Sequence, residues 1–133
     1  MNTRALLLAA MLAAPLASVE AADAAPAAAA DVLDRPAQMS PLASKKLLQM
    51  AAAAGDRLVA VGQRGHILTS TDGQTWTQSA VPVSSDLTAV FFVNDTSGWA
   101  VGHDGVILAS ADGGLTWTRQ LDGRSANEAL VKH

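Results

Sequence analysis

Two aspartates, Asp72 and Asp112, occupy the same place in a repeated segment and are the residues best placed to do chemistry. Each lies in a pattern that begins with serine and ends with Thr-Trp, Ser70–Trp76 in the first copy and Ser110–Trp117 in the second. Such a carboxylate can be a ligand or a catalytic acid, or it can accept hydrogen bonds from the N–H groups of its own turn. The last role is sufficient to explain an aspartate in a tight hairpin. We therefore predict that both aspartates close their turns.

The other positions of the pattern fit the same structural role. Glycine supplies a positive φ without steric cost, the β-branched threonine favours the strand that follows, and tryptophan covers the sheet while its N–H seeks a partner. We assign a structural role to Ser70, Asp72, Gly73, Thr75, Trp76, Ser110, Asp112, Gly114, Thr116 and Trp117. We predict no catalytic, cofactor-binding or metal-binding residue.

Other residues that could do chemistry lack the neighbouring motif residues that their chemistry requires. The turns Gly62–Gly65 and Gly102–Gly105 are not followed by the Lys-Ser/Thr pair of a phosphate-binding loop. His66 and His103 fall at different positions of their copies and the chain has no cysteine, so no metal-ligand spacing is present. We expect both histidines at the surface or in turns. Four scattered arginines are interpreted as solubilising surface residues: Arg57, Arg64, Arg119 and Arg124.

The elements that must position these turns repeat with a period of about 40 residues. Strands are predicted over 47–53, 57–61, 66–70 and 75–81, and again over 87–93, 99–101, 106–110 and 116–121, although 47–53 also suits a short helix. The run Val90–Val93 is continuously apolar, which is typical of a strand buried on both faces. Four short antiparallel strands form one blade of a β-propeller. The predicted fold class is all-β, with two such four-stranded blades making an incomplete propeller after an N-terminal signal peptide.

The ends of the chain predict export and a short connection to the blades. Residues 1–21 have the basic start, apolar run and small-residue site of a signal peptide cleaved after Ala21, so we expect a periplasmic protein. Residues 22–46 are an Ala/Pro-rich linker or arm, which could instead add a strand through Val32-Leu33. The blades occupy 47–121, divided into 47–82 and 86–121. Residues 122–133 are a tail or the start of a truncated third blade.

The segment from Ala51 to Gln120 resembles the photosystem II assembly/stability factor-like family of propellers built from Asp-box, or BNR, repeats. The pattern Gly-Trp-Ala-Val-Gly-x-x-Gly-x-Ile-Leu-x-Ser-x-Asp-Gly-Gly-x-Thr-Trp at 98–117 carries the resemblance. It implies an exported propeller, typically of about seven blades, whose photosynthetic members help to assemble a membrane complex by binding a subunit precursor. For this chain it implies a non-catalytic protein-binding or assembly module, without a cofactor, whose partner is a periplasmic or membrane protein.

Composition and missing residue types limit the alternatives. A net charge of −3 without a basic stripe argues against nucleic-acid binding. Asp-boxes also occur in sialidases and other glycoside hydrolases, but sialidases use a tyrosine nucleophile and this chain has no tyrosine. Two further hypotheses are a truncated fragment of a longer propeller without independent function, and a homo-oligomer in which several copies close a ring.

Overall fold

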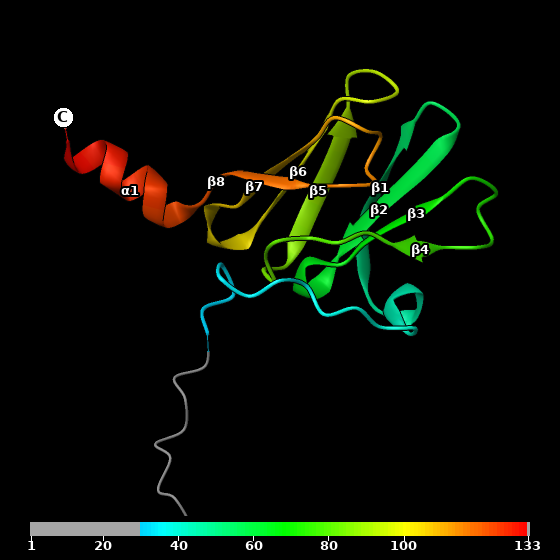
Figure 1. Ribbon diagram of the computed structural model, residues 1–133, viewed down its shortest axis with the longest axis horizontal. Coiled ribbons are helices and arrows are strands. Elements are labelled where there is room, and N and C mark those ends of the chain that lie inside the picture. Colours follow the sequence, from blue (N-terminus) through cyan, green and yellow to red (C-terminus); the bar gives the residue numbers. More distant parts are fainter. Residues whose placement is uncertain (1–29, 133) are drawn as a thin grey trace, which may run out of the picture.

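The computed structural model describes residues 30–132, so the predicted signal peptide at 1–21 lies outside the described residues. Two four-stranded antiparallel sheets follow each other along the chain (Figure 1). Blade 1 contains β1 (Leu48–Ala54), β2 (Arg57–Gly62), β3 (Ile67–Ser70) and β4 (Thr77–Gln78). Blade 2 contains β5 (Leu87–Phe92), β6 (Gly98–Gly102), β7 (Ile107–Ser110) and β8 (Thr118–Leu121). Short 3₁₀ turns lie at Ala43–Lys45, Gln63–Gly65 and His103–Gly105, and α1 (Gly123–Val131) follows blade 2.

Both sheets pair their strands in chain order with the same register. Val61 lies opposite Ile67 in blade 1, as Val101 lies opposite Ile107 in blade 2. The core lies between the blades, where one face of blade 1 packs against one face of blade 2. This arrangement is the all-β, incomplete-propeller architecture predicted from the repeat.

Strand bounds differ from the predictions mainly at the outer edge of each blade. Residues 48–54 form strand β1 and not a helix, because β2 supplies a hydrogen-bonding partner along its whole length. The fourth strands are shorter than expected, with two residues in β4 and four in β8. The Asp-box turns take up the preceding residues, since their N–H groups bond to Asp72 or Asp112 instead of to a neighbouring strand.

Residues 30–46 form an arm that crosses the lower end of both sheets (Figure 1). They form no strand, so the alternative of an added strand is wrong. The arm is held by side-chain burial and by single backbone bonds: Leu33 and Ala37 are buried, and the Ala37 N–H donates to the Val81 carbonyl. Val32 packs against the same core and its carbonyl accepts the Ser84 N–H.

The later part of the arm covers the β3–β4 part of one face of blade 1, while Leu58 of β2 on the same face remains 40% exposed. Ala43 and Leu68 are only 2% and 1% exposed. A common hollow is lined by Leu68, Trp76 and Gln78 of the blade together with residues 39–41, 43 and 44 of the arm. The Gln78 side chain accepts the Ser40 N–H and donates to the Gln38 carbonyl. We call this side of blade 1, which is remote from blade 2, the capped face.

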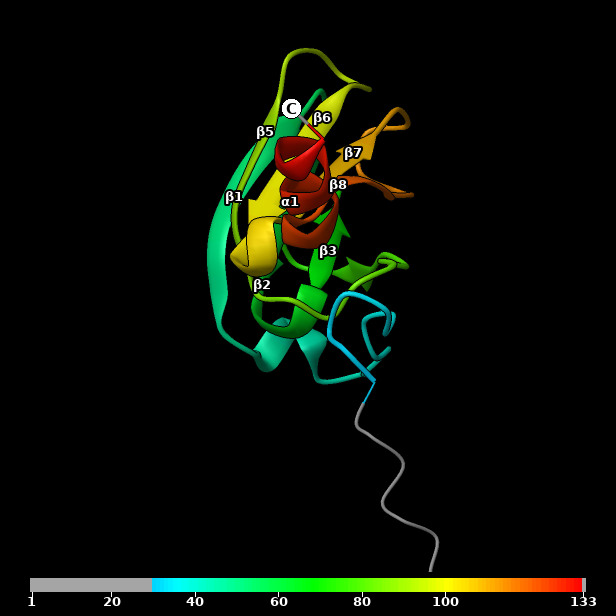
Figure 2. The ribbon, with the colours of Figure 1, turned by 90° about the vertical axis from the view of Figure 1, so that its left-hand side faces the viewer.

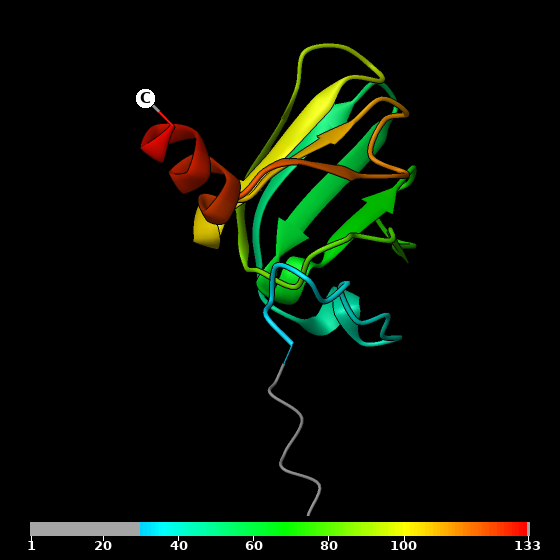
Figure 3. The same ribbon diagram turned by 60° about the vertical axis from the view of Figure 1, so that its left-hand side comes forward.

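Residues 123–131 form a helix where the sequence suggested a tail or the start of a third blade. Asp122 and Ser125 form a reciprocal capping box, which satisfies the free N–H groups at the helix start. Figures 2 and 3 show α1 standing on the side of blade 2 that is remote from blade 1. None of its residues is buried, and Leu130 and Val131 are strongly exposed.

Candidate functional site

The first Asp-box turn is closed by its own serine and aspartate. The Asp72 carboxylate accepts the N–H groups of Gln74 and Thr75, each at 2.8 Å, and also the Ser70 hydroxyl. The Ser70 oxygen accepts the Gly73 N–H at 2.8 Å. Gly73 has a φ of 74°, the left-handed conformation that glycine adopts at no cost. Asp72 therefore holds the turn through its Oδ1 atom.

The second Asp-box turn is closed by the equivalent serine and aspartate, and Trp117 adds two further contacts. Asp112 accepts from the Thr116 N–H and hydroxyl and from the Ser110 hydroxyl, and Ser110 accepts the Gly114 N–H. The additional contacts are those of Trp117, whose indole Nε1 donates to the Gly114 carbonyl at 3.0 Å and whose ring packs edge-on against Phe92.

This second turn also joins the two blades. Nη1 of Arg57 donates to the carbonyls of Asp112 and Gly113, at 3.2 and 3.1 Å. The Ser79 hydroxyl donates to the carbonyl of Gly114 at 2.8 Å. The interpretation of Arg57 as a solubilising residue is therefore wrong, because a half-buried guanidinium that bonds two carbonyls holds the blades together.

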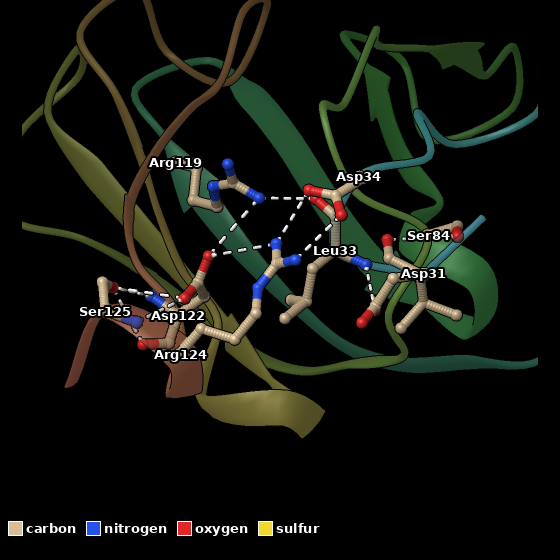
Figure 4. Close-up of polar contacts among 9 residues, drawn as sticks. Asp31, Leu33, Asp34, Ser84, Arg119, Asp122, Arg124 and Ser125 are labelled. Carbon is tan, nitrogen blue, oxygen red and sulfur yellow. Dashed lines mark hydrogen bonds and ion pairs between the residues drawn. The ribbon is translucent and has the colours of Figure 1, made fainter. Parts of the chain in front are cut away.

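A second polar cluster fixes the start of α1 (Figure 4). Arg124 forms a two-pronged ion pair with Asp34 of the arm, with both N–O distances at 2.8 Å. Arg119 lies 3.4 Å from Asp122 and also donates to the Leu33 carbonyl. The hydrogen bond from Arg124 lowers the pKa of Asp34, and the Ser125 N–H lowers that of Asp122. Arg119 and Arg124 lie at the surface, as expected from the sequence, and they also connect the arm, β8 and α1.

His66 closes the turn between β2 and β3, as one of the two expectations had it, but it is buried and does not lie at the surface. Its side chain is 4% exposed beneath the arm, near Gln38. Burial lowers its pKa, and the neighbouring charges of Arg64 and Lys46 act in the same direction, while the Gln38 carbonyl opposes them. The arm was not expected to cover the β2–β3 turn, and this is why the sequence placed His66 at the surface.

We expect acid to destabilise the protein in two steps. The fold favours the neutral form of His66. The stability that this form contributes is therefore complete above the ordinary pKa of 6.5, and it is lost as the pH falls through the lowered pKa of the folded state. The pKa of Asp72 is lowered by the Thr75 and Gln74 N–H groups, so its contribution is lost only below about 3.8. Burial raises the pKa of Asp112, but the Thr116 and Ser110 hydrogen bonds outweigh it, giving the same sign.

Urea midpoints between pH 8 and pH 2 would measure both steps. His66→Gln should remove the upper step, and Asp72→Asn should weaken the lower one. A midpoint that stays constant from pH 7 to pH 2 would contradict the expectation.

An exposed apolar surface lies on blade 2, on the side remote from blade 1. It is lined by Phe91, Val93, Trp99, Ile107, Gln120 and Leu121, and we call it the open face. Phe91 and Val93 are 51% and 63% exposed, so the prediction that Val90–Val93 is buried on both sides is wrong. The rings of Phe91 and Trp99 stack with their centroids 5.4 Å apart.

The repeat itself explains why this face is open. Trp99, Val101 and Ile107 occupy the positions that Val59, Val61 and Ile67 occupy in blade 1. The three residues of blade 1 have no exposed surface, because blade 2 packs on them. In the described part of the chain no sheet packs on their counterparts in blade 2. Comparing the two copies position by position would have revealed this surface in the sequence.

The described residues were compared with the requirements of a metal site and of a membrane-spanning helix. Between residues 30 and 132, no group of three or more His, Cys, Asp or Glu side chains is arranged to hold a metal ion. Over the same residues, no helix is sufficiently long and apolar to span a bilayer. The two Asp-box turns and the contacts of Arg57, Arg119 and Arg124 stabilise the fold. We therefore take the open face as the candidate site.

Comparison with known proteins identifies a matching family and a solved structure with a similar fold. A family described as "DUF6242 beta propeller domain" matches residues 26–130. No curated protein matches the sequence. A solved structure described as "YCF48 bound to D1 peptide" is 23% identical, with a TM-score of 0.50 over 56% of this chain. The chain spans only 26% of that protein's chain.

The likeness to the solved chain shows the fold, and both findings support the resemblance to photosystem II assembly factor-like propellers. The matched family covers well over half of the sequence, including both four-stranded sheets and their Asp-box turns. The chain therefore belongs to the DUF6242 beta propeller domain family.

Proposed function

We propose that this protein is an exported, non-catalytic binding module that uses the open face of blade 2 to attach to a protein of the cell envelope. The observation that carries the proposal is the open face itself. Contiguous exposed apolar surface is costly in water and marks interaction sites when it survives in a folded protein. The stacked Phe91–Trp99 pair gives it the aromatic centre that protein interfaces favour.

Three further observations support the proposal. The solved chain with the same fold is described as bound to a peptide, which favours protein binding for this propeller as well. The Asp-box carboxylates of Asp72 and Asp112 are occupied by their own turns, which leaves them unsuited to acid–base chemistry. The basic start, apolar run and small-residue site of residues 1–21 support export to the periplasm.

A comparative capture experiment tests this function. Full-length protein purified from the periplasm serves as bait on envelope extracts, beside Phe91→Glu and the control Leu58→Glu. Leu58 is a 40% exposed leucine of blade 1, so its substitution makes the same change away from the open face. We expect one envelope protein to be captured by the wild type and the control, and at least about tenfold less by Phe91→Glu.

Two results would contradict the proposal. Capture that is equal for all three baits, or no capture above background, would remove the open face as the binding site. A mature protein whose first residue is not Ala22 would contradict cleavage after Ala21.

A further inference from the structure

We infer that the open face binds the open face of a second copy, giving a two-fold symmetric dimer. This inference rests on the proposed function and names its partner: the envelope protein to which the open face attaches is a second copy of this chain. Within one chain, the corresponding face of blade 1 is already covered by a sheet, and Val59, Val61 and Ile67 are fully buried there. In blade 1, the face that corresponds to the open face is therefore covered by a second sheet.

The capped face determines which copy-to-copy contact is available. A ring of copies would require the open face of one copy to pack on the capped face of the next. Residues 39–44 already lie there, over Leu68, and the Gln78 side chain holds them through Ser40 and Gln38. A contact between two open faces needs no such displacement. It is isologous, because each copy contributes the same surface, and it therefore closes at two copies.

The chemistry of the open face suits self-association. All six lining residues are uncharged, so two copies can meet there without placing like charges opposite one another. The two sheets would bury the exposed Phe91, Val93 and Leu121 at the face-to-face spacing of about 10 Å that is usual between packed sheets.

Helix α1 enlarges the surface that a second copy would cover. It stands on the same side of blade 2 as the open face (Figures 2 and 3). The Asp34–Arg124 ion pair fixes its start, and Leu130 and Val131 remain 75% and 86% exposed. A copy that approaches the open face from this side also meets these two residues.

Light scattering on a sizing column tests the dimer directly. The purified periplasmic protein should show twice the mass of one chain, Phe91→Glu should show the mass of one chain, and Leu58→Glu should remain a dimer. Circular dichroism of each variant establishes that it is folded. As a second readout, tryptophan emission of the wild type should shift to longer wavelength on dilution, and Trp99→Phe should lose that shift.

The outcomes separate this inference from the proposed function. A wild type that is monomeric at every concentration, or a Phe91→Glu variant that stays dimeric, overturns the dimer. A discrete trimer or tetramer also overturns it, in favour of a ring with a displaced arm. A monomer that still captures an envelope protein through Phe91 leaves the proposed function standing, whereas a monomer that captures nothing removes both.

Discussion

Trp117→Ala should lower the free energy of unfolding by about 3–5 kcal/mol, the usual cost of removing a large aromatic side chain from a core. Trp117 is 5% exposed, its indole donates to the Gly114 carbonyl, and its ring packs on Phe92. The substitution therefore leaves a cavity between the blades and removes one of the two hydrogen bonds to that carbonyl, which keeps the bond from the Ser79 hydroxyl. The midpoint of urea unfolding, followed by circular dichroism, measures the loss.

Trp76 provides the matched control, since it occupies the same position of the first Asp-box. It is half-buried beside the arm, without the deep position of Trp117 between two sheets. Trp76→Ala should therefore cost less than half as much. Trp117→Phe, which keeps most of the ring and loses the N–H, should fall between the two alanine variants. Equal losses for Trp76→Ala and Trp117→Ala would contradict the unequal packing described above.

Gly65→Ala should be the second large effect, at about 2–5 kcal/mol. Gly65 has a φ of 73°, which costs about 1–2 kcal/mol for a residue with a Cβ atom. The added Cβ would also overlap the Val83 carbonyl oxygen and lie 3.2 Å from the Cβ of Ala37. Relieving that overlap requires the arm or the connection between the blades to move, which adds the cost of overpacking.

Gly73→Ala separates the two contributions to that loss. Gly73 has almost the same φ, 74°, but an added Cβ would meet nothing closer than 3.9 Å. This variant should lose only the conformational part, about 1–2 kcal/mol. Urea midpoints of both variants, measured side by side, give the difference. If both lost the same amount, the close approach of the Val83 carbonyl and of Ala37 to Gly65 would have no energetic consequence.

Much of the fold could be predicted from the sequence because the repeat carries its information locally. The turn residues around Asp72 and Asp112 mark where each blade reverses, and the apolar spacing between them marks the strands. The capping pair Asp122 and Ser125 was also present as a local signal for the helix start. The repeat that precedes it favours a further strand, so the two signals conflict at this position.

The errors concern contacts between segments that are distant in sequence. Whether Phe91 is buried depends on what packs against blade 2, which its own strand does not encode. His66 was placed at the surface because nothing in its repeat indicates that the arm covers it. Arg57 reaches another blade through a long side chain, and its partners are backbone carbonyls, which leave no pattern in a sequence.

The double use of the second Asp-box turn has a consequence for how the molecule unfolds. Gly114 belongs to blade 2, but its carbonyl accepts the Ser79 hydroxyl of blade 1. Opening this turn breaks blade 2 and, in the same event, the support of blade 1. In repeat proteins the interaction free energy between neighbouring repeats sets the cooperativity of unfolding. The two repeats should therefore melt together as one thermodynamic unit, with hydrogen-exchange protection rising and falling in both at once.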